Sequence, residues 1–109
     1  MRAPQRGEVW LVDLGLAAKV RPCLVLSVPP DDSDRALATL VPHTTSLRDS
    51  RFEASLISVP FLRRGGFDAQ NLVTVPHAKL IRRLGQLTPT QFGQVESKVC
   101  EWLGLARPT

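Results

Sequence analysis

Short runs of β-branched, aromatic and aliphatic residues recur along the first 81 residues of this 109-residue chain. Clusters of proline, glycine and aspartate separate them. Runs of this length and composition predict β-strands, and a series of short strands with turn residues between them predicts a small, strongly bent sheet or barrel. We expect a single domain over residues 1–109, because so short a chain has little room for a second core. The predicted strands cover residues 8–14, 22–28, 36–43, 52–58 and 72–81.

Two local signals interrupt this series. Residues 63–66 read Arg-Arg-Gly-Gly, which predicts a flexible turn. Pro76 lies inside the last predicted strand, where it removes a backbone donor and should break or bend the strand.

A helix is predicted after the strands. Thr88 and Gln91 have the spacing of a capping box, and Pro89 occupies the first helical position, where proline is favoured. Gly104 predicts a C-terminal cap. Apolar residues recur between these ends at spacings of three or four, as on one helical face, at Phe92, Val95, Val99 and Leu103. The expected fold is therefore mainly β with a C-terminal α-helix.

The charge of the chain points to an anionic partner. Lys and Arg number 14 against 10 Asp and Glu, so the formal net charge is +4, and a basic surface attracts polyanions. Cys23 and Cys100 lie far apart in apolar runs, which predicts two reduced core thiols rather than a disulfide or a zinc site. No segment has the apolar length of a signal peptide or a membrane span, so we expect a cytoplasmic protein without membrane contact.

Motifs for metal, nucleotide or acyl-transfer chemistry are absent from the sequence, including HExxH, the P-loop, GxGxxG and the nucleophile elbow. Polar residues at strand ends remain as candidates. Arg21 precedes an apolar run, where its guanidinium could hold a phosphate at two points, although a salt-bridged arginine is the ordinary alternative. The hydroxyls of residues 44–46 could bind phosphate oxygens, although such runs are common in strand-end turns.

Three motifs, in this order, resemble those of the MazF/PemK toxins. Residues 6–14 (RGEVWLVDL) resemble the opening strand of that family, and residues 21–27 (RPCLVLS) resemble its second motif. Residues 41–46 (VPHTTS), followed by Phe-Glu-Ala at 52–54, resemble its third. The order and approximate spacing also agree, so the chain is identified as similar to this family.

The chain departs from the family pattern in two places. The first loop, residues 15–20, is shorter than the loop that helps to close the RNA groove in the family. In the strand after Asn71, Pro76 stands where some members carry an acidic residue, while His77 falls near the usual glutamine and Lys79 near the usual Arg or Lys. These departures leave the general acid and base unassigned.

The resemblance implies a small SH3-like, strongly bent antiparallel β-barrel with a C-terminal α-helix, assembled as a homodimer with RNA along the subunit interface. It implies a type II toxin that cleaves single-stranded RNA (mRNA) by attack of the ribose 2′-hydroxyl on the adjacent phosphate, with no metal or other cofactor. It also implies a partner, a MazE-like antitoxin whose acidic, disordered tail competes for the RNA groove.

Site residues follow from the same resemblance. Arg21 matches the family arginine and is assigned to stabilising transition-state charge, with proton donation as a second role. Thr44 matches the family threonine and should hold a non-bridging oxygen. Further residues expected to bind RNA are Lys19, His43, Thr45, Ser46, Arg48, His77 and Lys79.

The sequence leaves two alternative functions open. A CcdB-like gyrase poison would share the architecture but bind a protein instead of cutting RNA. A non-catalytic nucleic-acid-binding barrel would need only the positive charge. RNA cleavage in the presence of EDTA separates all three, because only the ribonuclease cuts.

Overall fold

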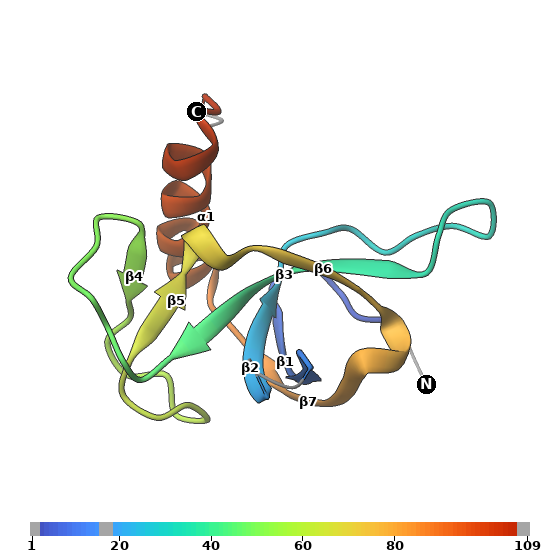
Figure 1. Ribbon diagram of the computed structural model, residues 1–109, viewed down its shortest axis with the longest axis horizontal. Coiled ribbons are helices and arrows are strands. Elements are labelled where there is room, and N and C mark those ends of the chain that lie inside the picture. The colour runs from blue at the N-terminus through green and yellow to red at the C-terminus, as the bar shows by residue number, and fades with distance from the viewer. Residues whose placement is uncertain (1–2, 16–18, 107–109) are drawn as a thin grey trace.

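The computed structural model describes residues 3–15 and 19–106, so part of the first loop lies outside the described residues. The chain forms a strongly bent, mainly antiparallel β structure with one α-helix near its end (Figure 1). Its elements are β1 (Glu8–Asp13), β2 (Val20–Val25), β3 (Leu37–Thr44), β4 (Glu53–Ser55), β5 (Gly66–Asp68), the 3-10 turn η1 (Ala69–Asn71), β6 (Val73–Pro76), the 3-10 turn η2 (His77–Lys79), β7 (Leu80–Gln86) and α1 (Pro89–Leu103).

β3 organises the sheet, because it contacts three other strands. It pairs with β2 on one side, and on the other it pairs with β6 along its first half and with β5 at its C-terminal end (Figure 1). β1 pairs with β2 and β7, and β4 pairs with β5, all antiparallel. Among the described residues β6 and β7 are joined only through η2 and share no ladder, so the predicted barrel is strongly bent but not closed.

The strand predictions are confirmed in order, with two corrections. The last predicted strand is two strands, β6 and β7, separated after Pro76 as expected. The flexible turn predicted at residues 63–66 is wrong at its end, because Gly66 begins β5 and pairs with Thr44 and Ser55. A run of two glycines reads as a turn in the sequence, yet here the missing Cβ atoms let one strand approach its neighbours closely.

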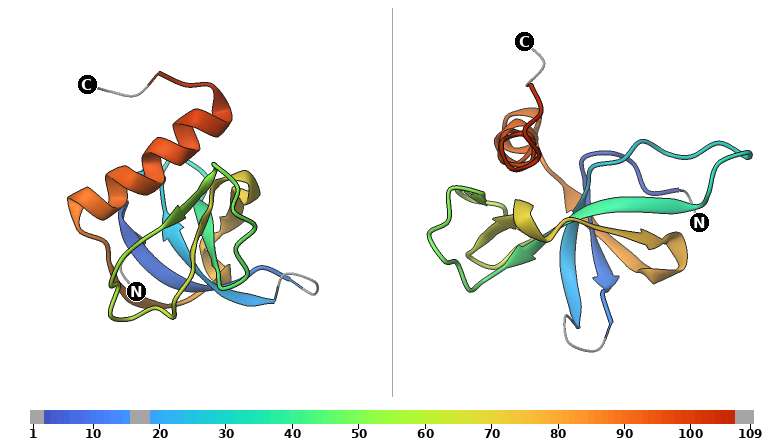
Figure 2. Two further views of the ribbon diagram at one scale, coloured as in Figure 1. Left: turned by 90° about the vertical axis from the view of Figure 1, so that its left-hand side faces the viewer. Right: turned by 45° about the horizontal axis from the view of Figure 1, so that its top comes forward.

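The core has two parts on either side of the bent sheet. One lies between the strands and α1, which crosses one face of the sheet (Figure 2), and it includes Leu24, Phe67 and Val95. The other fills the bend formed by β1, β2, β3, β6 and β7, and it includes Trp10 and Leu40. Burial of these large apolar side chains is the main force that holds the strands in place.

α1 begins and ends where the sequence predicts. Thr88 Oγ1 accepts a hydrogen bond from Gln91 N (3.1 Å), and Gln91 Oε1 accepts one from Thr88 N (3.0 Å), which completes the capping box. Gly104 caps the C-terminus in the left-handed conformation, with a φ of 71°. The predicted buried face is wrong at Leu103, which is 49% exposed, because its side chain falls outside both core clusters.

Candidate active site

The two predicted catalytic residues lie on neighbouring strands, β2 and β3, and line the same hollow. β2 and β3 pair with Cys23 opposite Pro42 and Leu24 opposite Val41. Arg21 precedes this paired stretch on β2 and Thr44 follows it on β3, so the two residues lie toward the same end of the two strands. Both residues line one hollow of about 410 Å³, called here the Arg21 hollow.

The hydroxyl of Thr44 is held in place by the turn that follows it. Thr44 Oγ1 accepts a hydrogen bond from Ser46 N at 3.0 Å, and the side chain is half-buried at the last position of β3. Because this bond uses a lone pair of the oxygen, the hydroxyl proton remains available to donate. Thr44 can therefore donate to an anionic oxygen in the Arg21 hollow.

His43 occupies the centre of this region. It is 5% exposed, and its ring packs edge-on against Phe67, with centroids 5.2 Å apart. It lines the Arg21 hollow and two adjoining hollows. Burial, and secondarily the positive charge of Arg21, lower the pKa of His43 below its ordinary value of 6.5. The imidazole is therefore neutral at neutral pH and adds no charge to the site.

We expect acidification to destabilise the fold through His43. Because the folded-state pKa lies below 6.5, the unfolded chain binds this proton more tightly. The contribution of neutral His43 to the free energy of unfolding is complete above the unfolded-state pKa, and it is lost as the pH falls through the folded-state pKa. Thermal melts at about pH 7 and about pH 5 should show a smaller loss of Tm in His43→Gln than in the wild type. His77→Gln is the matched control, and an equal loss in all three proteins would contradict the prediction.

Cys23 is confirmed as an inert core thiol. It is fully buried, and burial raises its pKa to about 12, against a smaller lowering effect of Arg21. A neutral, inaccessible thiol cannot act as a nucleophile. Cys100 is also buried and free, so the prediction of two reduced thiols holds.

A second hollow, of about 580 Å³, adjoins the first at Arg21 and His43. Lys19 and Thr45 line it, as do Arg63 and Arg82, two arginines that no sequence motif indicated. We call it the basic hollow. The Arg21 hollow also has two unforeseen polar residues, Asp68 and Asn71, with Asn71 Nδ2 donating to Asp68 Oδ2 at 2.6 Å.

Comparison with known proteins identifies the family. The model of the PemK-like, MazF-like toxins of type II toxin–antitoxin systems matches residues 5–103. The chain belongs to this family.

Relatives and solved structures agree with this assignment. Endoribonuclease MazF1 of Mycobacterium bovis is 32% identical over 109 residues, covering 99% of this chain and all of the relative. An endoribonuclease structure from a mycobacterial species is 28% identical, with a TM-score of 0.81, over 99% of this chain and 98% of that one. A second mycobacterial endoribonuclease, solved with its cognate antitoxin, has a TM-score of 0.80 and 28% identity, over 99% of this chain and 100% of that one.

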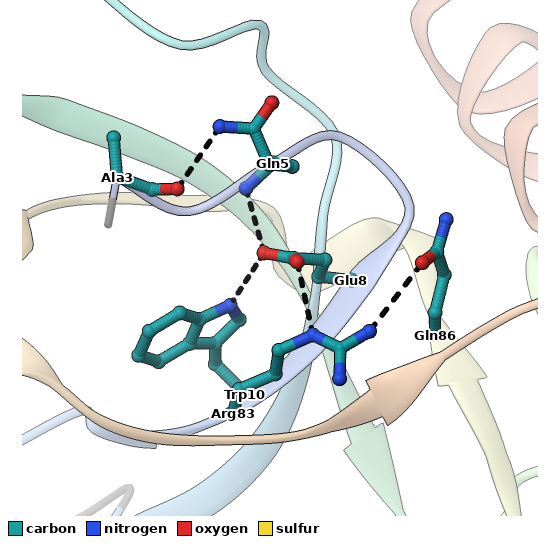
Figure 3. Close-up of polar contacts among 6 residues, drawn as sticks. All are labelled: Ala3, Gln5, Glu8, Trp10, Arg83 and Gln86. Carbon is teal, nitrogen blue, oxygen red and sulfur yellow. Dashed lines mark hydrogen bonds and ion pairs between the residues drawn. The ribbon is translucent and has the colours of Figure 1, made fainter. Parts of the chain in front are cut away.

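A buried polar network of this MazF-like toxin is centred on Glu8, at the start of β1 (Figure 3). Glu8 is 2% exposed and accepts hydrogen bonds from Gln5 N (2.8 Å), Trp10 Nε1 (3.1 Å) and Arg83 Nε (2.9 Å). These bonds tie β1 to β7. Because neighbouring side chains of a strand point to opposite faces, the Arg83 contact leaves Arg82 to face the other way, where it lines the basic hollow.

Other predicted RNA-binding residues of this MazF-like toxin lie elsewhere. Ser46 and Arg48 follow β3 in an exposed loop, where Arg48 N donates to both carboxylate oxygens of Glu53 at 3.0 Å. His77 and Lys79 lie on η2, beside the opposite end of β3 from Thr44, and His77 Nε2 is 3.2 Å from Leu37 O. The structure therefore does not bring these four residues into the two hollows at Arg21.

Within residues 3–15 and 19–106, no group of three or more His, Cys, Asp or Glu side chains could hold a metal ion. No helix there is long and apolar enough to cross a membrane.

Proposed function

We propose that this chain is the toxin of a type II toxin–antitoxin pair and cleaves single-stranded RNA, including mRNA. Residues 1–109 would act as one toxin domain. The observation that carries the proposal is the placement of Arg21 and Thr44, from two paired strands, in a single hollow. Relatives matched over nearly the whole chain are named endoribonucleases, which supports the same activity here.

The proposed reaction is attack of a ribose 2′-hydroxyl on the adjacent phosphate, without a metal or other cofactor. The bond between phosphorus and the 5′-oxygen breaks, so the products carry a 2′,3′-cyclic phosphate and a 5′-hydroxyl. Negative charge grows on the phosphate oxygens in the transition state, and preorganised donors stabilise it best. The planar guanidinium of Arg21 can grip two oxygens, and the hydroxyl of Thr44 can donate to a third.

Pure protein incubated in EDTA with RNA of mixed sequence tests the activity. Cuts with 5′-hydroxyl ends, mapped by primer extension, are expected. Replacing the ribose before the cut with deoxyribose should stop cleavage, because the nucleophile is gone. Uncut RNA in EDTA, or cutting that survives the deoxyribose substitution, would refute the proposed reaction. A CcdB-like gyrase poison or a non-catalytic binding barrel would leave the RNA intact.

Thr44→Val is expected to slow single-turnover cleavage roughly 10- to 100-fold, because it keeps the branched shape and removes a hydroxyl that donates to a charged oxygen. Thr44→Ser keeps the hydroxyl and should retain most of the activity. Thermal melts of both variants check that the turn at Ser46 persists. Equal rates for the valine variant and the wild type, with unchanged melts, would remove Thr44 from the site.

We propose that a MazE-like antitoxin with an acidic, disordered tail inhibits this toxin. The cations around Arg21 would attract such a tail as they attract RNA. A solved relative with its cognate antitoxin supports a partner of this kind. Adding the antitoxin to the EDTA cleavage assay should stop the reaction, and undiminished cleavage in the presence of bound antitoxin would contradict shared use of the site.

A homodimer is proposed as the working form. Large apolar side chains are exposed at the end of α1 and just after it, where Trp102 is 43%, Leu103 49% and Leu105 58% exposed. Exposed apolar surface of this kind favours a protein contact, and a two-fold pair would double both the basic surface and the site. Light scattering after size exclusion should give about twice the monomer mass of 12.0 kDa. A clean monomer at micromolar concentration would contradict the proposal.

A further inference from the structure

The basic hollow has the size and position of a ligand site beside the proposed scissile phosphate. Its volume of about 580 Å³ falls within the range of roughly 300–1,000 Å³ that is usual for small-ligand sites. The start of β2, the exposed face of β7 and the segment around Arg63 form its walls. It shares Arg21 and His43 with the Arg21 hollow, so a linear polymer bound in one hollow can continue into the other.

Three of the four cations of the basic hollow form no ion pair with a described residue. Arg21, Lys19, Arg63 and Arg82 line it, and no carboxylate does so among the described lining residues. The last three form no ion pair with a described residue. By contrast, Arg83, the neighbour of Arg82, is paired with Glu8 at 2.9 Å. Like charges gathered at one place repel one another, and a bound anion reduces that repulsion.

An aromatic ring gives the same hollow an apolar wall. Phe61 is half-buried and packs so closely on Gly85 that a Cβ there would lie 2.5 Å from the ring. Pro22 adds a second apolar surface. Cations beside a fixed aromatic ring match a ligand that has both phosphate and a flat base, which is the chemistry of a single-stranded nucleotide.

We propose that the basic hollow binds a nucleotide of the RNA that neighbours the scissile phosphate, with Arg63 and Arg82 on its phosphate and Phe61 against its base. The inference rests on the proposed ribonuclease function and extends it to a substrate subsite. An acidic peptide would satisfy the cations as well. The aromatic wall and the continuity with Arg21 and His43 favour the nucleotide.

Binding of an uncleavable ligand tests the subsite separately from catalysis. The probe is a fluorescein-labelled single-stranded DNA hexanucleotide with the mapped cut sequence, or with mixed sequence if no cut is found, and its deoxyriboses lack the nucleophile. Arg63→Ala and Arg82→Ala should each raise Kd roughly threefold to tenfold. Each should also reduce the slope of log Kd against log salt concentration by about 0.7, the contribution of one phosphate contact on a single strand. Arg35→Ala is the control, because it removes one positive charge just before the start of β3, at the end away from Thr44. It should change neither Kd nor the salt slope much.

The ring is tested with Phe61→Leu, which keeps an apolar side chain and removes the stacking surface. It should weaken binding roughly fivefold or more without reducing the salt slope, because base–aromatic stacking contributes about 1–3 kcal/mol. Melting curves confirm that each variant is folded. In the cleavage assay, Arg82→Ala should raise KM and leave kcat close to that of the wild type.

Four results would overturn the subsite. Unchanged Kd and salt slope in the Arg63→Ala/Arg82→Ala double variant would exclude phosphate contact. If the same variant bound an acidic antitoxin peptide more weakly but the DNA probe as tightly as the wild type does, the hollow would belong to a protein partner. Unchanged Kd in Phe61→Leu would exclude stacking. A loss of kcat in Arg82→Ala would place Arg82 in catalysis instead. Absence of cleavage by the wild type would contradict the proposed function, whereas the binding measurements would still decide the subsite.

Discussion

Arg21→Lys is expected to lower the single-turnover rate of RNA cleavage roughly 10²- to 10³-fold, the usual cost of removing one electrostatic stabiliser of a transition state. The substitution keeps the positive charge, so a large loss of cleavage rate would come from the changed geometry of the contact with phosphate. A guanidinium can bind two phosphate oxygens at once, whereas an ammonium acts as a point charge. Arg21 lies in the paired strand β2 opposite Val12, so its backbone position should persist in the variant.

Controls for Arg21→Lys come from the same assay. His43→Gln and His77→Gln should each slow cleavage less than Arg21→Lys, because neither histidine occupies a position that the family pattern requires. Melts of Arg21→Lys should match the wild type. Near-wild-type cleavage by Arg21→Lys, with unchanged melting, would eliminate the proposed site. A loss in His43→Gln as large as that in Arg21→Lys would make His43 the leading proton-transfer residue.

The pairing of β2 with β3 explains why the sequence indicated Arg21 and Thr44 as candidates but could not predict that they lie together. The sequence places Arg21 before one apolar run and Thr44 after another, and each position alone suits a salt bridge or a turn. Only the folded chain, in which β2 and β3 pair with Cys23 opposite Pro42, brings the two side chains to one hollow. Strand pairing is a long-range property, so local composition predicted the strands and the family resemblance was needed to relate their ends.

Arg63, Arg82 and Phe61 were missed for a different physical reason. They are polar or aromatic residues in a turn and on an exposed strand, with no motif of their own, in a chain with 14 Lys and Arg residues. Their role depends on which cations lie together in a hollow that no described carboxylate lines, and only the folded surface determines this. The helix, in contrast, was predictable down to Thr88 and Gly104, because caps are made by residues close together in the chain.

Gly65 supports the site in a way that neither composition nor motif revealed. A Cβ atom there would lie 2.1 Å from the carbonyl oxygen of Thr44 and 3.0 Å from Cε1 of His43. The first contact is with backbone, which cannot rotate away as a side chain can. Gly65 therefore allows the segment before β5 to lie directly against the end of β3, which carries the hydroxyl of Thr44.

Gly65→Ala is accordingly expected to destabilise the protein by about 1–3 kcal/mol, the usual cost of overpacking. It should also slow cleavage roughly 10²-fold at temperatures where the variant is folded, because a displacement of about 1 Å in a catalytic group has an effect of that size. Gly93→Ala, on α1 with nothing within 4 Å of the added Cβ, is the matched control. It should raise stability by about 0.5–1 kcal/mol, as for glycine in a helix interior, and leave cleavage unchanged. Chemical unfolding and single-turnover cleavage measure both effects. A Gly65→Ala variant that is destabilised yet cuts RNA at the wild-type rate would mean that the β3 end does not position the reacting phosphate.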